Sequence, residues 1–323
     1  MPTSRGTVLQ WAMPEIISVS RRTDIPAFYT DWFMNRIRAG FACVRNPFNA
    51  RQVRTVSLAP SDVACLVFWT RDPRPLLSHL AELDARGLHY YFQITLTGLP
   101  RPWELAAPPS TEIVSAIHTL SRRIGPERIL WRFDPLVLAD DRPVEQTIAT
   151  FESFAEKLKG AASRVTVSFL RGYRQTRRRL RALPGGWRDW DALTESEWET
   201  NARPLVEAIA AGAAARGMEP GACAEPRDLT AWGLPPAACI DTGLIGRLFG
   251  IGLSAVKDRN QRKECCCAPS VDLGAYGSCR HGCRYCYAGA DAALRRGERH
   301  NPDQPGLLGT FAEPGETGEI GEL

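Results

Sequence analysis

The chain has none of the long apolar runs that direct a protein into or through a membrane. No segment approaches ~20 uninterrupted apolar residues, the length that a membrane-spanning helix needs. The opening stretch Met1-Pro-Thr-Ser-Arg-Gly6 has no apolar core of a secretion signal, so we expect a cytoplasmic protein with no membrane partner. A formal charge of only +4 permits an anionic substrate but does not require one.

A disulfide framework is also excluded, although the chain contains ten cysteines. In a chain of 323 residues without a secretion signal, so many thiols indicate metal or redox chemistry. Their distribution is uneven, because eight of them lie between Cys223 and Cys286. The other two, Cys43 and Cys65, stand in apolar runs, and we expect them to be buried bystanders.

The sharpest motif is a C-x3-C-x2-C loop formed by Cys279, Cys283 and Cys286. It has no fourth thiol nearby, whereas structural zinc sites usually combine two C-x2-C pairs to complete a tetrahedron. Three thiolates can hold three irons of a cubane cluster and leave the fourth iron open to bind and activate a small molecule. Gly282 gives the loop backbone the freedom to wrap a cluster. For His281, within the loop, we expect a solvent-exposed turn position.

A second group of cysteines precedes this loop. The preferred ligand set is Cys223, Cys239, Cys265 and Cys267, with Cys266 as a spare, because residues i and i+2 can face the same way. Four thiolates would complete a second, auxiliary cubane cluster. A structural zinc ion and a group of free thiols remain alternatives, since the long spacing makes this a weaker signal.

Strand-like and helical patterns alternate through the first two-thirds of the chain. The apolar, β-branched or aromatic runs that predict strands are 16–21, 64–70, 90–97, 129–133 and 164–170. The patterns that predict helices are 27–39, 73–85, 110–124, 144–158 and 201–216. This alternation predicts an α/β fold with a parallel sheet, as a full or partial (β/α) TIM-like barrel over residues 14–220. A cysteine-rich segment, 221–300, is expected to pack on the barrel, followed by a disordered tail, 301–323.

Polar residues collect where the predicted strands end, and in a (β/α) barrel that edge carries the site. Each arginine–aspartate pair there could also be a structural ion pair, but five strands ending this way favour a site. The catalytic candidates are Arg21, Asp24, Arg132 and Asp134, and the candidates for cofactor binding are Gln93 and Ser168.

An arginine cluster follows the fifth predicted strand. It comprises Arg171, Arg174, Arg177, Arg178, Arg179 and Arg181. Such a run is typical of a solvated helix face, and its alternative role is contact with the phosphates of a nucleotide or nucleic acid.

The sequence of the cysteine loop, with Tyr285 directly before the third thiol, resembles the cluster-binding loop of the radical S-adenosylmethionine (SAM) superfamily. The stretch Cys279-Arg-His-Gly-Cys-Arg-Tyr-Cys-Tyr-Ala288 looks most like the spore photoproduct lyase-related branch. Over most of its length the chain also resembles the DUF1848 family, through residues 16–29, 44–48 and 270–276. In most superfamily members the cluster loop follows the first strand, whereas here it comes after five or six βα units.

The superfamily resemblance implies an enzyme with a [4Fe-4S] cluster whose open iron binds SAM. Reductive cleavage of SAM would give a 5′-deoxyadenosyl radical that acts on a substrate, and Tyr285 would pack near the adenine. A reductant such as flavodoxin or ferredoxin would supply the electron. The substrate stays open between a small molecule, a nucleotide and a nucleic acid. Two other functions remain: a non-radical iron–sulfur protein for electron transfer or redox sensing, and a zinc-stapled nucleic-acid-binding protein.

Overall fold

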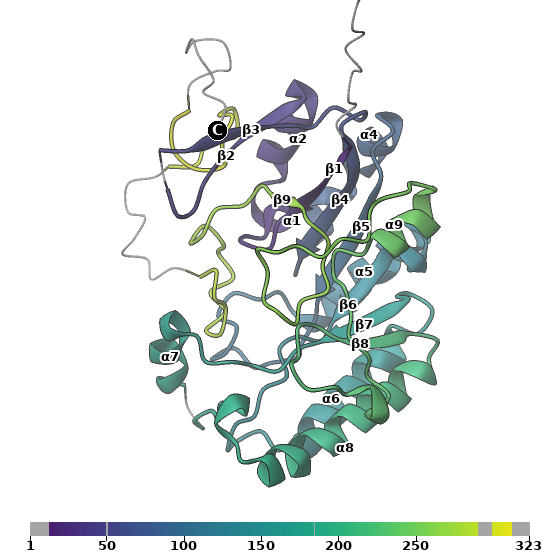
Figure 1. Cartoon of the computed structure of the whole chain (residues 1–323), viewed down its shortest axis with the longest axis vertical. Coiled ribbons are helices and arrows are strands. Elements are labelled where there is room, and N and C mark those ends of the chain that lie inside the picture. The colour runs from purple at the N-terminus through teal and green to yellow at the C-terminus, as the bar shows by residue number, and fades with distance from the viewer. Residues whose placement is uncertain (1–12, 50, 184, 290–298, 312–323) are drawn as a thin grey trace, which may run out of the picture.

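A computed structural model describes residues 13–49, 51–183, 185–289 and 299–311. Its centre is a seven-stranded parallel sheet in the order β8-β7-β6-β5-β4-β1-β9 (Figure 1). The strands are β1 (Glu15–Val19), β4 (Val63–Thr70), β5 (Tyr90–Thr95), β6 (Ile129–Arg132), β7 (Arg164–Val167), β8 (Glu219–Ala222) and β9 (Val271–Asp272). A separate antiparallel hairpin joins β2 (Phe41–Arg45) to β3 (Val53–Ser57). The predicted α/β class with a parallel sheet is therefore confirmed.

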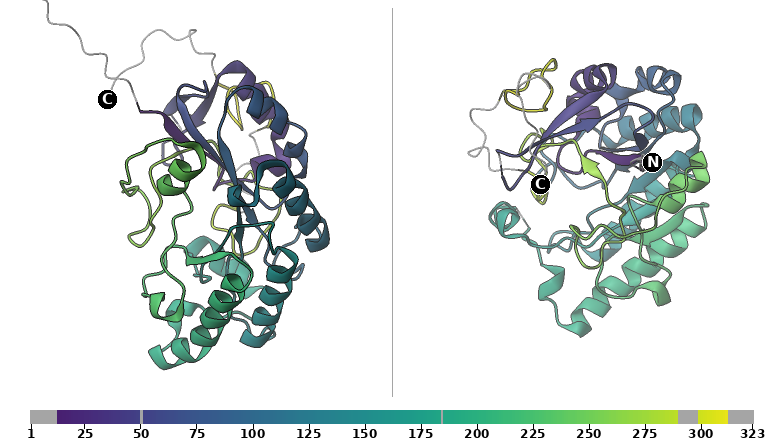
Figure 2. Two further views of the ribbon diagram at one scale, coloured as in Figure 1. Left: turned by 90° about the vertical axis from the view of Figure 1, so that its right-hand side faces the viewer. Right: turned by 45° about the horizontal axis from the view of Figure 1, so that its top comes forward.

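The helices connect successive strands of the sheet. They are α1 (Ile25–Phe28), α2 (Thr30–Ala39), α3 (Arg74–Leu77), α4 (Leu80–Ala85), α5 (Ser110–Ile124), α6 (Val144–Lys157), α7 (Arg174–Arg181), α8 (Glu195–Ala214) and α9 (Thr242–Phe249). Two predicted helices, 27–39 and 73–85, are each divided into two short ones. Proline begins α1 and α3, where its fixed φ suits a first turn. In Figure 1, α6 and α8 lie side by side at the bottom of the view, and the C-terminal loops cross in front of the sheet. The same two helices are neighbours in both views of Figure 2.

Each face of the sheet has its own hydrophobic core. Alternate strand residues, such as Ile17, Phe68 and Trp131, pack with the helices into the larger core. The intervening residues, among them Val67 and Tyr91, pack into a smaller core. The C-terminal segment supplies the rest of that smaller core through Ala224, Cys239, Ile240, Leu244, Ile245, Cys265, Cys267 and Ala268. Strands that are buried on both faces need apolar residues at every position. For this reason apolar and polar residues do not alternate along these strands.

The described strands form an open sheet, not the closed ring that a full barrel requires. β8 and β9 are the two edges, and no described strand joins them. The segment that follows β8 packs on one face of this open sheet, through residues such as Ile240, Leu244 and Ala268. A full barrel, which the alternation of elements had allowed, is therefore not what these strands build.

The C-terminal strand β9 is anchored beside β1 by one carboxylate. Asp272 Oδ2 accepts hydrogen bonds from Ser18 Oγ at 2.7 Å and the Arg21 backbone N–H at 2.8 Å. Asp272 Oδ1 accepts from Ser20 Oγ at 2.6 Å and the Gly274 N–H at 2.9 Å. Three of these bonds, from Ser18, Ser20 and Arg21, join segments about 250 residues apart in the sequence and compensate for the shortness of β9.

Residues 301–311, which the sequence assigned to a disordered tail, pack against the hairpin and α2. Trp32 Nε1 donates to the Gln304 carbonyl at 3.0 Å, the Cys43 N–H donates to the Pro305 carbonyl at 2.9 Å, and Leu307 is buried. The expectation of disorder is therefore wrong for 301–311, where apolar contacts outweigh the polar composition. Residues 312–323 lie outside the described part of the chain. Among the described residues, no helix is both long and apolar enough to cross a membrane.

Gly274 packs so closely against the end of β1 that a methyl group would not fit. A Cβ there would lie 1.9 Å from Ser20 Oγ and 2.8 Å from Ser20 Cβ. We expect Gly274→Ala to lower the free energy of unfolding by about 1–3 kcal/mol, because Ser20 must leave Asp272. Gly252→Ala is the matched control, since beyond its chain neighbours no atom lies within 4 Å of the place that its methyl group would take. Equal melting temperatures of the two variants would contradict this account.

Candidate active site

A cavity of about 280 Å³ lies at the carboxyl ends of the strands. Its floor is made by the residues that follow β1, β4, β6 and β7, among them Arg21, Arg71, Asp134 and Ser168. The C-x3-C-x2-C loop and the second cysteine group form two further walls. Both sets of candidate ligands therefore face one space, at the edge of a parallel sheet where active sites collect.

All three cysteines of the loop line this cavity. Burial raises the pKa of Cys279 to about 11 and that of Cys283 to about 12, so both are neutral thiols near pH 7 when nothing is bound. Arg71 acts against this rise at Cys283. Metal binding would have to displace these protons. Within the described ranges, no three His, Cys, Asp or Glu side chains converge on a point suited to a single metal ion.

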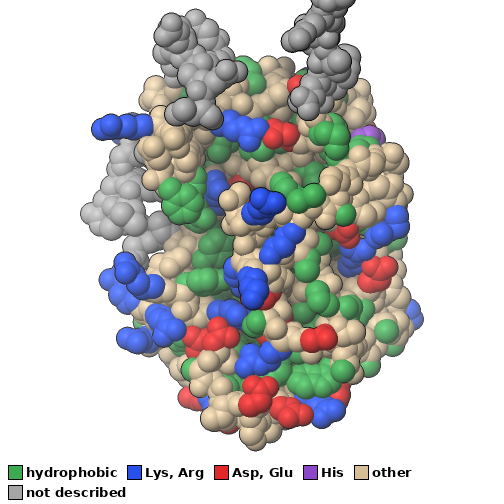
Figure 3. Space-filling view, in the orientation of Figure 1, with side chains coloured by type: hydrophobic (Ala, Val, Ile, Leu, Met, Phe, Trp, Pro, Cys, Tyr) green, Lys and Arg blue, Asp and Glu red, His purple; other side chains and the backbone are tan. Residues whose placement is uncertain are grey.

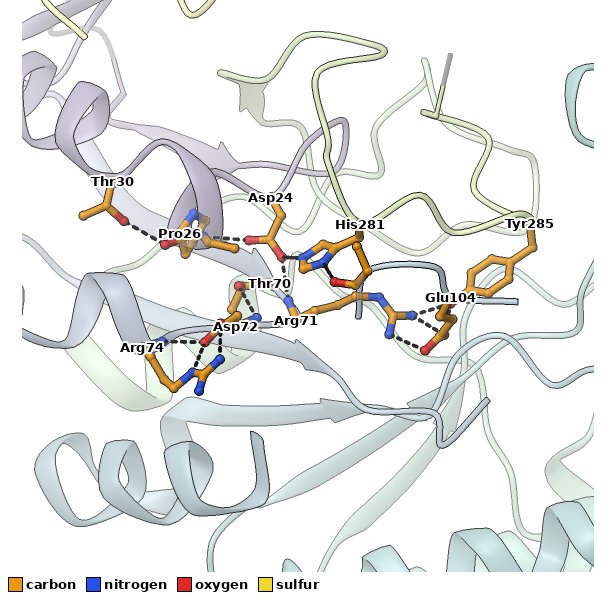
Figure 4. A network of polar contacts seen from close by, with 12 residues as sticks. Asp24, Pro26, Thr30, Thr70, Arg71, Asp72, Arg74, Glu104, His281 and Tyr285 are labelled. Atoms are coloured by element: carbon orange, nitrogen blue, oxygen red, sulfur yellow. Dashed lines mark hydrogen bonds and ion pairs between the residues drawn. The ribbon is translucent and has the colours of Figure 1, made fainter. Parts of the chain in front are cut away.

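The loop is held to the sheet by a buried histidine–aspartate pair. His281 Nε2 lies 2.8 Å from Asp24 Oδ2, and His281 Nδ1 lies 3.3 Å from the Ala106 carbonyl (Figure 4). Asp24 also accepts from the Arg71 and Ala27 backbone N–H groups. His281 is 3% exposed, so the expected solvent-exposed position is wrong: its ring is a tether between the loop and the end of β1.

A second tether joins Tyr285 to a buried ion pair. Arg71 donates to both Glu104 carboxylate oxygens, at 2.9 and 2.6 Å, and the Tyr285 hydroxyl contacts Arg71 and donates to Glu104 (Figure 4). Thr97 Oγ1 donates to the same carboxylate at 2.7 Å. Tyr285 lines the cavity, as expected for a cofactor contact, but its hydroxyl is engaged in this network. Backbone bonds support the attachment, since the Ala106 N–H donates to the His281 carbonyl at 2.9 Å.

The four cysteines of the second set form a chain of neighbouring thiols in the smaller core. Cys223 and Cys239 Sγ are 3.5 Å apart, and the Ile240 N–H donates to Cys267 Sγ at 3.4 Å. The Cys267 thiol lowers the pKa of Cys265 to about 7, although burial opposes this. All four line the cavity, whereas Cys266 is exposed at the surface. Cys43 and Cys65 are buried in β2 and β4 and are not part of the cavity wall.

The candidate residues at the end of β6 support this second set. Arg132 Nη1 donates to Cys239 Sγ at 2.8 Å, and the same guanidinium pairs with Asp134. Asp134 in turn accepts from Ser168 Oγ. Gln93, a predicted cofactor contact, is fully buried, and its Nε2 donates to the Cys239 carbonyl at 2.8 Å. Gln93 thus lies behind the cysteine set and is not among the residues that line the cavity.

The arginine cluster is divided between structural contacts and the surface. Arg171 pairs with Glu225 at 2.8 Å, and Arg177 pairs with Asp189 at 3.3 Å. Arg179 Nη2 donates to the Cys286 carbonyl at 2.7 Å, so α7 packs against the cysteine loop. Arg174 and Arg181 are exposed, as a solvated helix face predicts.

A larger cavity of about 830 Å³ opens between α8 and the start of β7 and β8. Small apolar side chains line most of it. Its charged residue Arg164 is already paired with Asp241 at 2.7 Å and Glu219 at 2.7 Å. It lies at the amino ends of the strands, and no cysteine is among the residues that line it.

Several site residues could not be recognised in the sequence. Glu104, Glu225 and Asp272 are isolated carboxylates in loops or in a two-residue strand, and their partners lie 33 to 254 residues away. Arg71 stood at a predicted strand end, which was the one available signal.

The chain belongs to the DUF1848 family. The model of the Domain of unknown function (DUF1848) family matches residues 16–288, which covers most of the chain, including both cysteine sets. Searches of curated proteins and of solved structures found no match.

Proposed function

We propose that this chain is a radical SAM enzyme whose catalytic cluster is held by Cys279, Cys283 and Cys286. The observation that carries the proposal is that all three thiols face one cavity at the carboxyl ends of a parallel sheet. Three thiolates leave one iron of a cubane cluster for a ligand from solution. When bound, such a cluster would supply the electron that cleaves SAM to methionine and a 5′-deoxyadenosyl radical.

The residues around the loop would fix the orientation of the cluster. His281 is bound to Asp24 at the start of α1, and Tyr285 is bound to Glu104 in the segment after β5, so the loop is attached at two points to segments that follow strands of the sheet. The three cysteines are half-buried, which would limit the access of water to a reactive species. We further propose that the fold is a (β/α) barrel opened between β8 and β9, with the segment after β8 filling its interior.

The second cysteine set has two candidate occupants. An auxiliary iron–sulfur cluster is favoured by the buried guanidinium of Arg132 at Cys239 Sγ, since that charge would compensate thiolates. A structural zinc ion is favoured by the 3.5 Å separation of Cys223 and Cys239 Sγ. Tetrahedral bonds of about 2.3 Å to zinc place two thiolates roughly 3.8 Å apart. Metal and sulfide analysis distinguishes the two.

The test is SAM cleavage by the anaerobically reconstituted chain. After iron and sulfide are quantified, dithionite and SAM are added, and 5′-deoxyadenosine and methionine are measured by chromatography. We expect both products, together with a change in the electron paramagnetic resonance spectrum of the reduced protein when SAM is added. Full iron loading with neither product and an unchanged spectrum would reject the proposal and favour a non-radical electron-transfer or redox-sensing protein. Zinc without iron would favour the zinc-stapled alternative.

A further inference from the structure

Six arginines line the cavity, and they fall into two groups. Three have a carboxylate of their own within hydrogen-bond distance: the pairs are Arg71–Glu104, Arg132–Asp134 and Arg171–Glu225. The other three are Arg21, Arg22 and Arg262. No hydrogen bond joins a guanidinium of this second group to a carboxylate within the described residues.

Arg21 and Arg22 flank one aspartate that has no acceptor capacity left for them. Asp272 already accepts four hydrogen bonds from hydroxyl and backbone donors. The Nε atoms of Arg21 and Arg22 stand 3.9 and 4.0 Å from its two oxygens, beyond hydrogen-bond distance. Asp272 therefore holds the two arginines side by side electrostatically, while most of their N–H groups stay available.

The remaining contacts of these two side chains use few of their donors. Arg21 Nη2 donates to Ser270 Oγ at 3.1 Å. The Arg22 guanidinium lies over the Tyr276 ring, 5.3 Å from its centre, a contact that uses the π face and no N–H group. Their side chains are only 16% and 23% exposed. Each guanidinium has five donors, and both arginines line the cavity, where donors without a protein partner are accessible to an acceptor from solution.

We infer that Arg21 and Arg22 form a binding site for an anionic group, a phosphate or a carboxylate, on the substrate of this enzyme. Planar guanidinium groups match the oxygen atoms of both anions. Naming the substrate as the carrier rests on the proposed function, in which the open iron binds the carboxylate of SAM. The anion site itself rests on the contacts of the two arginines.

Arg262 also lines this cavity and adds a third guanidinium to its wall. Its guanidinium has no ion pair in the described ranges, and Tyr173, Cys223 and Asp134 are its charged or titratable neighbours. The Tyr173 ring is tilted against the Tyr287 ring, with 5.9 Å between their centres, and the Tyr287 hydroxyl donates to the Arg21 carbonyl at 3.4 Å. Figure 3 shows Lys and Arg side chains along the middle of the face that these loops cover. An approaching anion therefore meets positive charge before it reaches Arg21 and Arg22.

The test measures anion binding by calorimetry, with the full reconstituted chain and without SAM or reductant. Inorganic phosphate and acetate are the two probes, and the tighter one identifies the anionic group. We expect Arg21→Gln and Arg22→Gln to weaken the binding of that probe about tenfold or more, as the loss of charged hydrogen bonds does. Arg22→Lys should restore part of the affinity. Arg174→Gln is the matched control, because Arg174 is exposed and does not line the cavity.

Three results would overturn the inference. The first is that neither probe binds the unmodified chain. The second is that all variants bind the probe equally well. The third is that the Arg21 or Arg22 variants lose metal at the second cysteine set but keep their affinity for the anion. The last would show that the arginines only compensate thiolate charge. The calorimetry does not depend on SAM cleavage. Loss of anion binding with intact SAM cleavage would reject only this inference, and intact anion binding without SAM cleavage would reject only the proposed function.

Discussion

A chain in which Cys279, Cys283 and Cys286 are all alanine is expected to bind about four fewer irons than the unmodified chain and to form no 5′-deoxyadenosine. The three thiols line one wall of the cavity, and without them no other thiol of that loop remains to hold a cluster. The measurements are iron and sulfide per chain after anaerobic reconstitution, and chromatography of the SAM products. Full iron content or continued SAM cleavage in the triple variant would contradict the assignment.

The same variant isolates the second cysteine set. Metal that remains bound must belong to Cys223, Cys239, Cys265 and Cys267, so iron with sulfide identifies an auxiliary cluster, and zinc identifies a structural ion. Cys266→Ala is the matched control, because Cys266 is exposed and does not line the cavity. It should leave metal content and SAM cleavage unchanged.

Replacing Glu104 by alanine is expected to destabilise the protein by about 3–5 kcal/mol, because the buried Arg71 guanidinium loses its partner. The hydroxyls of Thr97 and Tyr285 lose their acceptor in the same step. Since Tyr285 belongs to the cysteine loop, we also expect weaker retention of iron on gel filtration. Urea unfolding of the metal-free chain measures the first effect, and iron content measures the second.

Two variants show whether this loss comes from the broken ion pair. A double variant, Arg71→Met with Glu104→Met, should recover much of the stability, because it leaves no unpaired buried charge. Glu207→Ala removes one carboxylate from an exposed helical ion pair with Arg203 and should change stability little. If Glu104→Ala is no more destabilising than Glu207→Ala, the network does not anchor the loop.

The sheet could be predicted from the sequence because its strands are buried on both faces. Their apolar runs stand out, and the pattern of α5 gave its observed bounds, Ser110–Ile124. The concentration of polar residues at strand ends also pointed to the edge of the sheet where the cavity of about 280 Å³ lies, since parallel strands place those ends together.

The way in which β9 and the cysteine loop dock on the sheet could not be predicted, because it depends on contacts between residues far apart in the sequence, and no local sequence pattern marks them. β9 has two residues, and its pairing with β1 is stabilised by Asp272, whose partners are more than 250 residues away. The turn residue His281 became a buried tether because Asp24 supplied an acceptor that no sequence pattern announces. That the sheet stays open could not be predicted either. The segment after β8 forms few regular elements, yet it packs on one face of the sheet.

The long sequence separation between His281 and its partner Asp24 has a consequence for biosynthesis. His281 and Asp24 are 257 positions apart, so the ribosome completes every strand from β1 to β8 before it makes the cysteine loop. Contacts of such long range form late, because closing a long chain segment costs entropy before any contact repays it. During that interval the cysteine loop does not yet cover the carboxyl ends of the strands. Under the proposed function, insertion of the cluster and docking of the last loop would then be one event.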